Sequence, residues 1–320
     1  MILSKILNFL KIPIDILVSI LILPSSLILY FFRRVGGHKL KLSRFILKKI
    51  GIFPIIKNYY EPVFDFDQLK FNLNEKRNLP GINMNVSEQI ELLKSLNYTN
   101  ELKQLNFDKL SPVSNFNINN NFFVGGDADI YYQIIRFYKP NKIIEIGSGY
   151  SSLVAVEAIN KNYREDNIKT SLVCIEPYEN KWLEKIGIEV IRKKIEDVDD
   201  TVVTKLNKND ILFIDSSHII KPQGDILKIY LEILPKLQPG VIIHIHDIFT
   251  PRDYPEKWLK EENRFYNEQY IIETLLDHSN RYKILCSLNF LKNEYFNDLK
   301  NVCPYLIKEN EPGSIYLIVN

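Results

Sequence analysis

The sequence predicts a doubly wound α/β fold, in which helices cover both faces of a mostly parallel sheet. From Phe122 onward, short apolar segments rich in β-branched residues alternate with segments of helical periodicity, and this alternation is typical of βαβ units. The strand segments are apolar almost throughout, as expected of a sheet that is buried on both faces. Glycines and acidic residues follow the first strands, at the sheet edge where such folds bind ligands.

Strands and helices can be assigned in order along this part of the chain. The expected strands are Lys142–Ile146, Ser171–Ile175, Glu189–Arg192, Ile211–Ile214, Val241–Ile245, Tyr282–Ser287 and Ser314–Val319. The expected helices are Ser152–Asn160, Asn180–Lys185, Val198–Leu206, Gly224–Leu237 and Asn267–Leu276, the second short and the third weakly periodic. Before this region, apolar residues recur at helical spacing over Ser87–Leu96 and predict one more helix.

The N-terminal residues are predicted to form a membrane anchor. Residues 12–32 read IPIDILVSILILPSSLILYFF, with Asp15 as the single charge, and about 20 residues at 1.5 Å each span the roughly 30 Å of a bilayer core. A cleaved signal peptide would have a shorter apolar stretch that ends in small residues, and a buried soluble helix would have a polar face. Because Pro24 interrupts the backbone hydrogen bonds, a full span and a bent, re-entrant anchor both stay open.

Basic residues dominate the segment that follows the anchor. They are Arg33, Arg34, Lys39, Lys41, Arg44, Lys48 and Lys49, whereas Lys5, Lys11 and the amino terminus precede the apolar stretch. The positive-inside rule therefore places the rest of the chain in the cytoplasm; a solvated basic loop is the alternative. We expect three parts: a hydrophobic membrane anchor over 1–35, an N-terminal extension or cap over 36–121, and the α/β domain over 122–320.

The composition excludes several classes of protein. The chain has 41 Lys and Arg against 39 Asp and Glu, a net charge of +2, which gives no electrostatic basis for binding nucleic acid. Its three cysteines, Cys174, Cys286 and Cys303, lie far apart and form no CxxC motif, so a reducing compartment is favoured over a disulfide-stapled secreted fold. The sequence leaves the oligomeric state open.

A glycine-rich turn and an acid follow the first two strands. The first strand leads into EIGSGYSS (145–152), where glycines permit a tight turn and a close ligand and the next helix points free N–H groups at that ligand. Ser152 stands at the third glycine of the dinucleotide fingerprint GxGxxG, so that fingerprint is incomplete. The second strand ends at Glu176, whose carboxylate could accept hydrogen bonds from both hydroxyls of a ribose; a solvated acid is the alternative.

A second group of polar residues follows the fourth and fifth strands. Asp215 and His218 share one loop, and His246 and Asp247 end the next strand. Neighbouring parallel strands are about 4.8 Å apart, so Asp215 and Asp247 could share one ion if these strands are adjacent. With an unperturbed pKa of roughly 6.5, His218 suits the role of general base at neutral pH. The alternatives are a loop-capping role for His218 and core packing for His246.

These motifs, in this order, resemble those of the class I S-adenosylmethionine-dependent methyltransferases, and specifically the bacterial methyltransferase-domain-24 group. The resemblance covers roughly Phe122 to Asn320 and is carried by EIGSGYSS (145–152), IEP at Glu176, DILFIDSSH (210–218), PGVIIHIHD (239–247), HDIFTPRDYP (246–255) and FYNEQY (265–270). It implies a Rossmann-like domain with an antiparallel last strand and S-adenosylmethionine as cofactor.

The resemblance also implies roles for single residues in cofactor binding. Gly147, Gly149 and Ser151 would line the methionine and ribose portion, with Ser152 beside them in the turn. Glu176 would hold the ribose hydroxyls, and Ile195 or Glu196 would border the adenine. Glu145 would orient the glycine turn or accept a hydrogen bond from the cofactor's ammonium group.

The chain is similar, further, to metal-dependent O-methyltransferases of the catechol, caffeoyl-CoA and macrolide-sugar types. This similarity implies Asp215, His246 and Asp247 as metal ligands and His218, next to Asp215, as the general base. His246 stands where an oxygen ligand is often found, and Ile248 where some members have Asn. Imidazole suits softer ions than magnesium, so magnesium, manganese and the absence of a metal all stay open.

We therefore expect a membrane-associated O-methyltransferase with its catalytic domain facing the cytoplasm and its membrane contact through residues 12–32. The acceptor would be a hydroxyl of a sugar, a glycolipid or another small metabolite, free or lipid-linked. Two alternatives remain, because fold does not fix function: a nucleotide-dependent oxidoreductase, and a catalytically inactive, membrane-tethered binding protein.

Overall fold

The computed structural model describes residues 2–109 and 115–320. Within it the chain forms two compact units, Met1–Lys70 and Phe71–Asn320. The first unit contains helix α1 (Ile2–Val35), helix α2 (Lys41–Ile50) and the short helix η1 (Phe66–Gln68); the second contains the sheet. The finer division expected from the sequence, after residues 35 and 121, stays a prediction.

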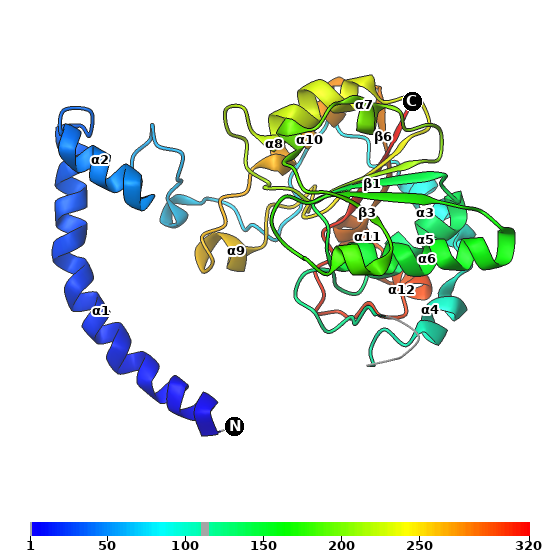
Figure 1. Ribbon diagram of the computed structural model, residues 1–320, viewed down its shortest axis with the longest axis horizontal. Helices are drawn as coiled ribbons and strands as arrows, with labels where there is room; N and C mark the ends of the chain where they lie inside the picture. The colour runs from blue at the N-terminus through cyan, green and yellow to red at the C-terminus, as the bar shows by residue number, and fades with distance from the viewer. Residues whose placement is uncertain (1, 110–114) are drawn as a thin grey trace. The chain divides into compact units, whose positions relative to one another are not determined.

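Helix α1 contains the apolar segment of residues 12–32. Among the described residues, Lys11–Val35 is the one stretch that is long and apolar enough to cross a membrane, with 25 residues and an 18-residue window of mean hydropathy 2.3 that contains no buried residue. The helix continues through Pro13 and Pro24 and is curved (Figure 1), and prolines within a helix remove backbone hydrogen bonds and bend it. By length and composition, α1 is therefore a candidate membrane helix.

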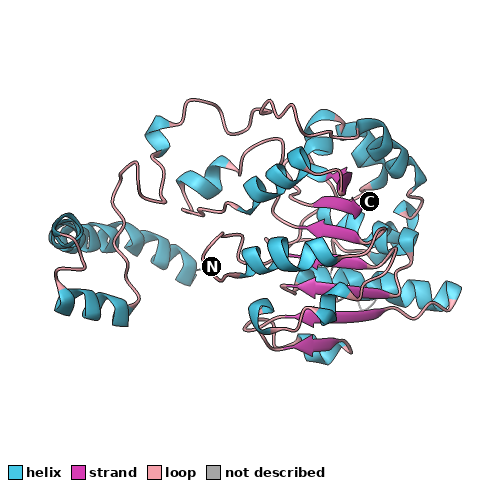
Figure 2. Ribbon diagram, turned by 90° about the horizontal axis from the view of Figure 1, so that it is seen from above, coloured by secondary structure: helices cyan, strands magenta, loops and turns pink. Residues whose placement is uncertain are grey.

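The second unit is built on one seven-stranded sheet in the order β3-β2-β1-β4-β5-β7-β6 (Figure 2). The strands are β1 (Lys142–Ile146), β2 (Ser171–Ile175), β3 (Glu189–Ile191), β4 (Ile211–Ile214), β5 (Ile242–Ile245), β6 (Tyr282–Ser287) and β7 (Ile315–Val319). The first five pair in parallel, and β7 runs antiparallel to both of its neighbours. The predicted strands and the antiparallel last strand are confirmed, with ends that differ by one residue at β3, β5 and β7.

Alternate residues of each strand face two layers of helices. Ile143 packs into one core and its neighbour Ile144 into the other, as the period of two in a strand requires. The first core contains residues of α3 (Val86–Ser95), α4 (Thr99–Leu105), α5 (Asp127–Tyr138), α6 (Tyr150–Asp166), α11 (Leu288–Glu294) and α12 (Phe296–Val302). The second contains residues of η3 (Ile195–Asp197), α7 (Thr201–Thr204), α8 (Asp225–Leu227), η4 (Lys228–Ile233), η5 (Leu234–Lys236) and α10 (Glu268–His278). The sheet is thus doubly wound, as predicted.

The helices differ from the prediction mainly where they are short. Helix α6 begins at Tyr150 and ends at Asp166, longer than expected, and the weak helix predicted over Val198–Leu206 is reduced to the single turn α7. The short helix expected over Asn180–Lys185 is η2 (Leu183–Ile186). The structure adds α2, α4, α9 (Glu256–Lys260), α11 and α12. Helices α4, α9, α11 and α12 have only five to seven residues and span too few turns for a distinct apolar period, which explains why the sequence did not predict these four.

Candidate active site

A cavity of about 820 Å³ opens at the carboxyl ends of β1, β2, β4 and β5. The strand order reverses between β1 and β4, and this switch point is where open α/β sheets bind ligands. The predicted residues that line the cavity are Gly147, Gly149, Ser151, Glu176, Ile195, Glu196, Asp215, His218, His246 and Asp247. One cavity therefore brings together most of the residues singled out from the sequence.

The glycine turn after β1 is packed against the end of β4. Gly147 has φ +77°, and a Cβ at this position would lie 1.7 Å from the carbonyl oxygen of Asp215. The backbone N–H of Asp215 donates to the carbonyl of Ile146 at 2.8 Å. Since a side chain at residue 147 would overlap backbone atoms, glycine is required for the turn and the acid of β4 to approach each other.

Glu176 is held at the cavity wall by backbone N–H groups. Its Oε1 accepts hydrogen bonds from the N–H groups of Tyr178 and Glu179, both at 2.9 Å, and its Oε2 lies 3.4 Å from the N–H of Ser148. The residue is only 9% exposed, so this loop fixes the direction of the carboxylate. Two oxygens offer about four lone-pair sites, which leaves acceptor capacity for the hydroxyls of a bound ligand.

Two residues of the cavity lining, Ser148 and Ser216, have buried hydroxyl groups. Among the described residues, neither hydroxyl has a hydrogen-bond partner. Buried polar groups are rarely left unsatisfied in folded proteins. The cavity therefore fits a polar ligand that lies along the glycine turn, as the cofactor of the predicted family would.

Glu145 and Ser152 lie beneath the cavity and do not line it. Glu145 is fully buried, accepts a hydrogen bond from the hydroxyl of Tyr131 at 3.0 Å, and is bonded to the hydroxyl of Ser152. Burial raises the pKa of Glu145 to about 7, although hydrogen bonds from Ser152, Tyr131 and Cys174 oppose this change. Glu145 and Ser152 are therefore placed to stabilise the glycine turn from within the protein, and they do not border the cavity themselves.

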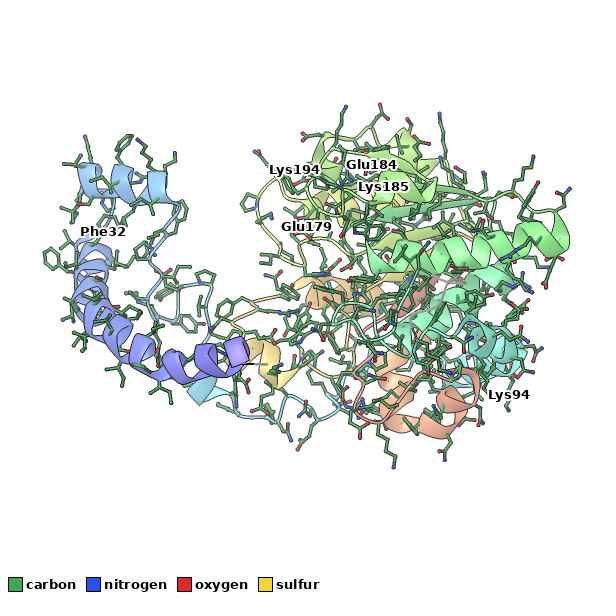
Figure 3. The ribbon with its side chains drawn as sticks, turned by 60° about the horizontal axis from the view of Figure 1, so that its bottom comes forward. Phe32, Lys94, Glu179, Glu184, Lys185 and Lys194 are labelled. Carbon is green, nitrogen blue, oxygen red and sulfur yellow. The ribbon has the colours of Figure 1, made fainter. Side chains whose placement is uncertain are left out.

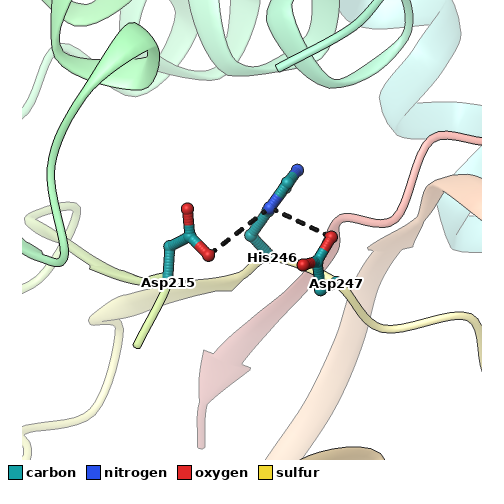
Figure 4. Close-up of side chains that lie close together, drawn as sticks. All are labelled: Asp215, His246 and Asp247. Atoms are coloured by element: carbon teal, nitrogen blue, oxygen red, sulfur yellow. Dashed lines mark ion pairs between the residues drawn. The ribbon is translucent and has the colours of Figure 1, made fainter. Parts of the chain in front are cut away.

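Asp215, His246 and Asp247 form a compact cluster at the ends of β4 and β5, which are adjacent and parallel (Figure 4). Each offers one potential ligand atom, and these atoms lie within 4.8 Å of one another. His246 Nδ1 lies 3.6 Å from Asp215 Oδ1 and 3.3 Å from Asp247 Oδ1, and it is buried without a hydrogen-bond partner among the described residues. One imidazole and two carboxylates are a donor set that a divalent cation can use.

The charges of this cluster are mutually dependent. Burial disfavours a charge on His246, but the charges of Asp247 and Asp215 outweigh it and raise the pKa of the ring. Burial likewise acts against the charge of Asp215, but the charge of His246 and a hydrogen bond from His218 lower the pKa of this acid well below its usual range. For Asp247, burial dominates and raises the pKa. The raised pKa of His246 and the lowered pKa of Asp215 therefore share one cause, the attraction between the imidazole and the carboxylates of this cluster.

His218 lies between the cluster and a buried acid, Glu268, that was not predicted from the sequence. Its Nε2 is 3.1 Å from Asp215 Oδ1, and its Nδ1 is 2.7 Å from Oε2 of Glu268, the first residue of α10. Glu268 is fully buried and also accepts a hydrogen bond from the hydroxyl of Tyr230 at 2.7 Å. Burial disfavours a charge on His218, but the hydrogen bonds to Asp215 and Glu268 outweigh it and raise its pKa.

The sequence contained one signal for Glu268. It lies in the motif FYNEQY (265–270), where an acid opens a helix whose next turns are apolar. The N–H groups of Asn267 and Glu268 both donate to the carbonyl of His218, at 3.0 and 3.2 Å, so the start of α10 fixes the loop that carries the histidine. Glu268 is therefore a positioning residue for His218.

Aromatic side chains from the segment after β5 also line the cavity. Trp258 and Tyr266 both belong to the lining, and their rings lie 5.9 Å apart, edge to face. The guanidinium of Arg264 lies 4.4 Å from the ring of Trp258, and the ring of His218 lies 4.7 Å from that of Tyr266. These aromatic side chains could bind the apolar face of an acceptor molecule.

Comparison with known proteins gives one family and one curated relative. Residues 144–248 match the model of a methyltransferase domain, a range that includes the glycine turn and the Asp215–His246–Asp247 cluster. An uncharacterized protein of Archaeoglobus fulgidus is 32% identical over 182 residues, which cover 51% of this chain and 78% of the relative.

Two solved structures to which this chain is similar are methyltransferases of low sequence identity. MycE from the mycinamycin biosynthetic pathway, in complex with Mg, SAH and mycinamycin VI, is 13% identical with a TM-score of 0.35, over 60% of this chain and 48% of MycE. The plantazolicin methyltransferase BpumL, in complex with SAH, is 15% identical with a TM-score of 0.37, over 73% of this chain and 95% of BpumL. This chain thus matches about half the length of MycE.

Proposed function

Because the chain belongs to the methyltransferase-domain-24 group of the class I S-adenosylmethionine-dependent methyltransferases, we propose that it methylates a hydroxyl of a sugar, a glycolipid or another small metabolite. The observation that supports this most strongly is the single cavity that contains both the glycine turn with Glu176 and the histidine–carboxylate cluster. A methyl donor on one side of this cavity would face an acceptor on the other. This membership favours methyl transfer over the oxidoreductase and over the inactive tethered protein.

Glu176 and the glycine turn are the residues proposed to bind the methyl donor. S-adenosylmethionine supplies a methyl group on a sulfonium, which carries its own leaving group. The protein then has to align donor and acceptor and to exclude water. Gly147, Gly149 and Ser151 would follow the methionine and ribose, Glu176 would accept hydrogen bonds from the ribose, and Ile195 and Glu196 would border the adenine. Glu145 and Ser152, beneath the turn, would fix its shape.

His218 is the proposed general base for an acceptor hydroxyl. Its Nε2 lies 3.1 Å from Oδ1 of Asp215 and 3.6 Å from Oδ2 of Asp247. Its Nδ1 can keep its proton and donate it in a hydrogen bond to Glu268. While both carboxylates of the cluster face the ring, its pKa is raised, which favours the protonated form. Engagement of Asp215 and Asp247 by another positive charge would lower that pKa, and the neutral ring could then accept the proton of the hydroxyl.

Asp215, His246 and Asp247 are the proposed ligands of a divalent cation, magnesium or manganese. Such a cation would lower the pKa of a nearby acceptor hydroxyl and orient it. The support is the donor set itself and the buried Nδ1 of His246, which has no hydrogen-bond partner in the part of the chain that the structure describes.

We also propose that α1 attaches the enzyme to a membrane with the catalytic domain on the cytoplasmic side. The support is the apolar stretch Lys11–Val35 and the basic residues that follow it, which favour the cytoplasmic side. Attachment would concentrate the enzyme near lipid-linked acceptors. Mass spectrometry of lipids and glycans from cells with and without the protein should then reveal products that differ by one methyl group.

The proposed activity can be tested with two histidine variants. Methyl incorporation from labelled S-adenosylmethionine is measured over a panel of hydroxyl acceptors for the wild type, for His218→Ala, and for His278→Ala as a matched control, since the side chain of His278 is 74% exposed. We expect a loss of roughly 10²-fold or more in transfer for His218→Ala and none for His278→Ala, with the affinity for the methyl donor unchanged in both. Equal transfer by the two variants would exclude His218 as the base, and binding of NADH in place of S-adenosylmethionine would reject the methyltransferase proposal.

A further inference from the structure

Helix α2 has an exposed apolar face. Leu42, Ile46 and Ile50 are spaced four residues apart and lie on one side of the helix together with Phe45. Their side chains are 74%, 48%, 65% and 64% exposed, respectively, and no residue of α2 is buried. An exposed apolar stripe of this size on a helix indicates a surface that binds something apolar.

The opposite side of α2 is basic. At 100° per residue, Arg44 and Lys48 lie away from the apolar stripe, together with Lys41, while Lys49 lies within the stripe, between Phe45 and Leu42. No acidic residue occurs between Arg33 and Tyr60. A short helix with one apolar and one cationic face is the pattern of helices that lie in the headgroup region of anionic bilayers. A protein partner with an apolar groove would not require cations around the stripe.

The chain connection keeps α2 close to the end of α1. Residues 36–40 link the helices, and five residues extend at most about 18 Å. The link is a defined turn, because Lys39 N–H donates to the carbonyl of Gly36 at 2.9 Å and a Cβ on Gly37 would lie 2.6 Å from the ring of Phe32 (Figure 3). If α1 ends at a membrane surface, α2 must begin within reach of the lipid headgroups.

The last turns of α1 carry the residue types found at such a surface. Arg34 donates a hydrogen bond to the hydroxyl of Tyr30 at 2.8 Å, and its guanidinium lies 5.2 Å from the centre of that ring. Tyrosine and arginine are enriched where a membrane helix meets the headgroups. The end of α1 and the start of α2 therefore fit the same layer.

From these observations we infer that α2 is a second membrane element, which lies in the surface of an anionic leaflet with Leu42, Phe45, Ile46 and Ile50 toward the acyl chains. The inference rests on the membrane attachment proposed for α1. In this arrangement, anionic phospholipid binds the segment between the anchor and the catalytic unit. The segment then lies along the membrane surface, where lipid-linked acceptors also lie.

The test uses the full-length protein with one added cysteine. The native cysteines Cys174, Cys286 and Cys303 are buried, so an environment-sensitive fluorophore can be attached selectively at Phe45→Cys, at Arg44→Cys on the opposite face, or at Leu21→Cys within α1. Each labelled protein is reconstituted into vesicles of phosphatidylcholine with phosphatidylglycerol, or of phosphatidylcholine alone. Iodide quenches labels in water, and lipids with a spin label on the acyl chain quench labels in the bilayer.

We expect the label at residue 45, in anionic vesicles, to be quenched by the spin-labelled lipid and protected from iodide, and the label at residue 44 to show the reverse. Adding Lys48→Glu to Phe45→Cys should weaken the protection roughly fivefold or more, because each basic charge contributes about that factor to binding an anionic leaflet. Lys48→Arg should leave it unchanged.

Two results would overturn the inference alone, with the label at residue 21 still in lipid. One is equal access of iodide to residues 44 and 45; the other is protection of residue 45 from both quenchers, which would mean that protein covers the stripe. Access of iodide to residue 21 as well would overturn the proposed anchor together with the inference.

Discussion

Replacement of Gly147 by alanine should disturb the turn on which the proposed cofactor site depends. Gly147 has φ +77°, and the added Cβ would lie 1.7 Å from the carbonyl oxygen of Asp215. A non-glycine residue in this left-handed region costs about 1–2 kcal/mol, and forcing a methyl group into packed backbone costs a further ~1–3 kcal/mol. The turn and the end of β4 must therefore separate, which moves the residues proposed to hold the methyl donor.

Gly187 provides a matched control for the backbone contribution. Its φ is +78°, but a Cβ there would meet no atom within 4 Å, and the residue does not line the cavity. Gly187→Ala should therefore lose only the ~1–2 kcal/mol of the left-handed conformation. The difference between the two variants isolates the overlap with Asp215.

Thermal unfolding and titration with S-adenosylmethionine measure the two consequences separately. In a chain of this size, roughly 2–4 °C of melting temperature corresponds to 1 kcal/mol, so Gly147→Ala should melt several degrees below Gly187→Ala. Its affinity for the methyl donor should also fall by at least ~10-fold, because small displacements of binding groups have large effects. Equal melting temperatures and equal affinities in the two variants would refute the reasoning.

Three further predictions concern the acids Glu268, Glu145 and Asp247. Glu268→Gln should reduce methyl transfer by roughly 10²-fold or more and shift its pH profile while leaving donor affinity unchanged, since an acid that orients a catalytic histidine affects turnover to this extent; an unchanged pH profile would contradict the positioning role. Burial raises the pKa of Glu145 from 4.5 to about 7, so the stability that its protonated form contributes is complete below pH 4.5 and is lost as the pH rises through 7. Glu145→Gln should remove this loss, which amounts to up to about 3 kcal/mol in the free energy of unfolding. If the melting temperatures of wild type and variant changed with pH in the same way across this range, the prediction would be wrong. Asp247→Asn should raise the concentration of manganese or magnesium needed for half-maximal transfer by ~10-fold or more, and full wild-type activity in EDTA would contradict a metal role.

The sheet could be predicted from the sequence because its strands are apolar on both faces. Segments such as Ile211–Ile214 are buried throughout, and a short, continuous apolar run of β-branched residues is typical of a strand covered by helices on both sides. The short helices could not be predicted in this way. In α11 and α12, of seven residues each, too few turns are present for the apolar spacing to stand out, and packing against the sheet stabilises them instead.

The site could be predicted to the extent that it follows strand ends. Asp215 and Asp247 come directly after adjacent strands, so topology alone brings them together. Glu145, in contrast, lies within β1 and alternates with Ile144 and Ile146, so the period of two directs it into the core with Ile143 and away from the cavity edge. The burial of Glu145 could therefore have been predicted from the alternation of residues in the strand.

Glu268 could not be predicted from local pattern. It is 50 residues away from His218 in the sequence, and only the packing of α10 against the loop after β4 brings the two side chains into contact. The helical period around Glu268 indicates that it opens a helix, and it does not reveal that the acid faces a histidine.

Titration of the wild type and Glu176→Gln with S-adenosylmethionine tests the central claim, that the strand edge with the glycine turn holds this donor. Glu184→Gln, at an exposed acid that pairs with Arg192 outside the cavity lining, is the control. The account predicts wild-type binding, the same affinity for Glu184→Gln, and a roughly 10- to 100-fold weaker affinity for Glu176→Gln, as expected for the loss of a charged hydrogen bond. Absence of binding by the wild type, or equal affinity of the two variants, would contradict it.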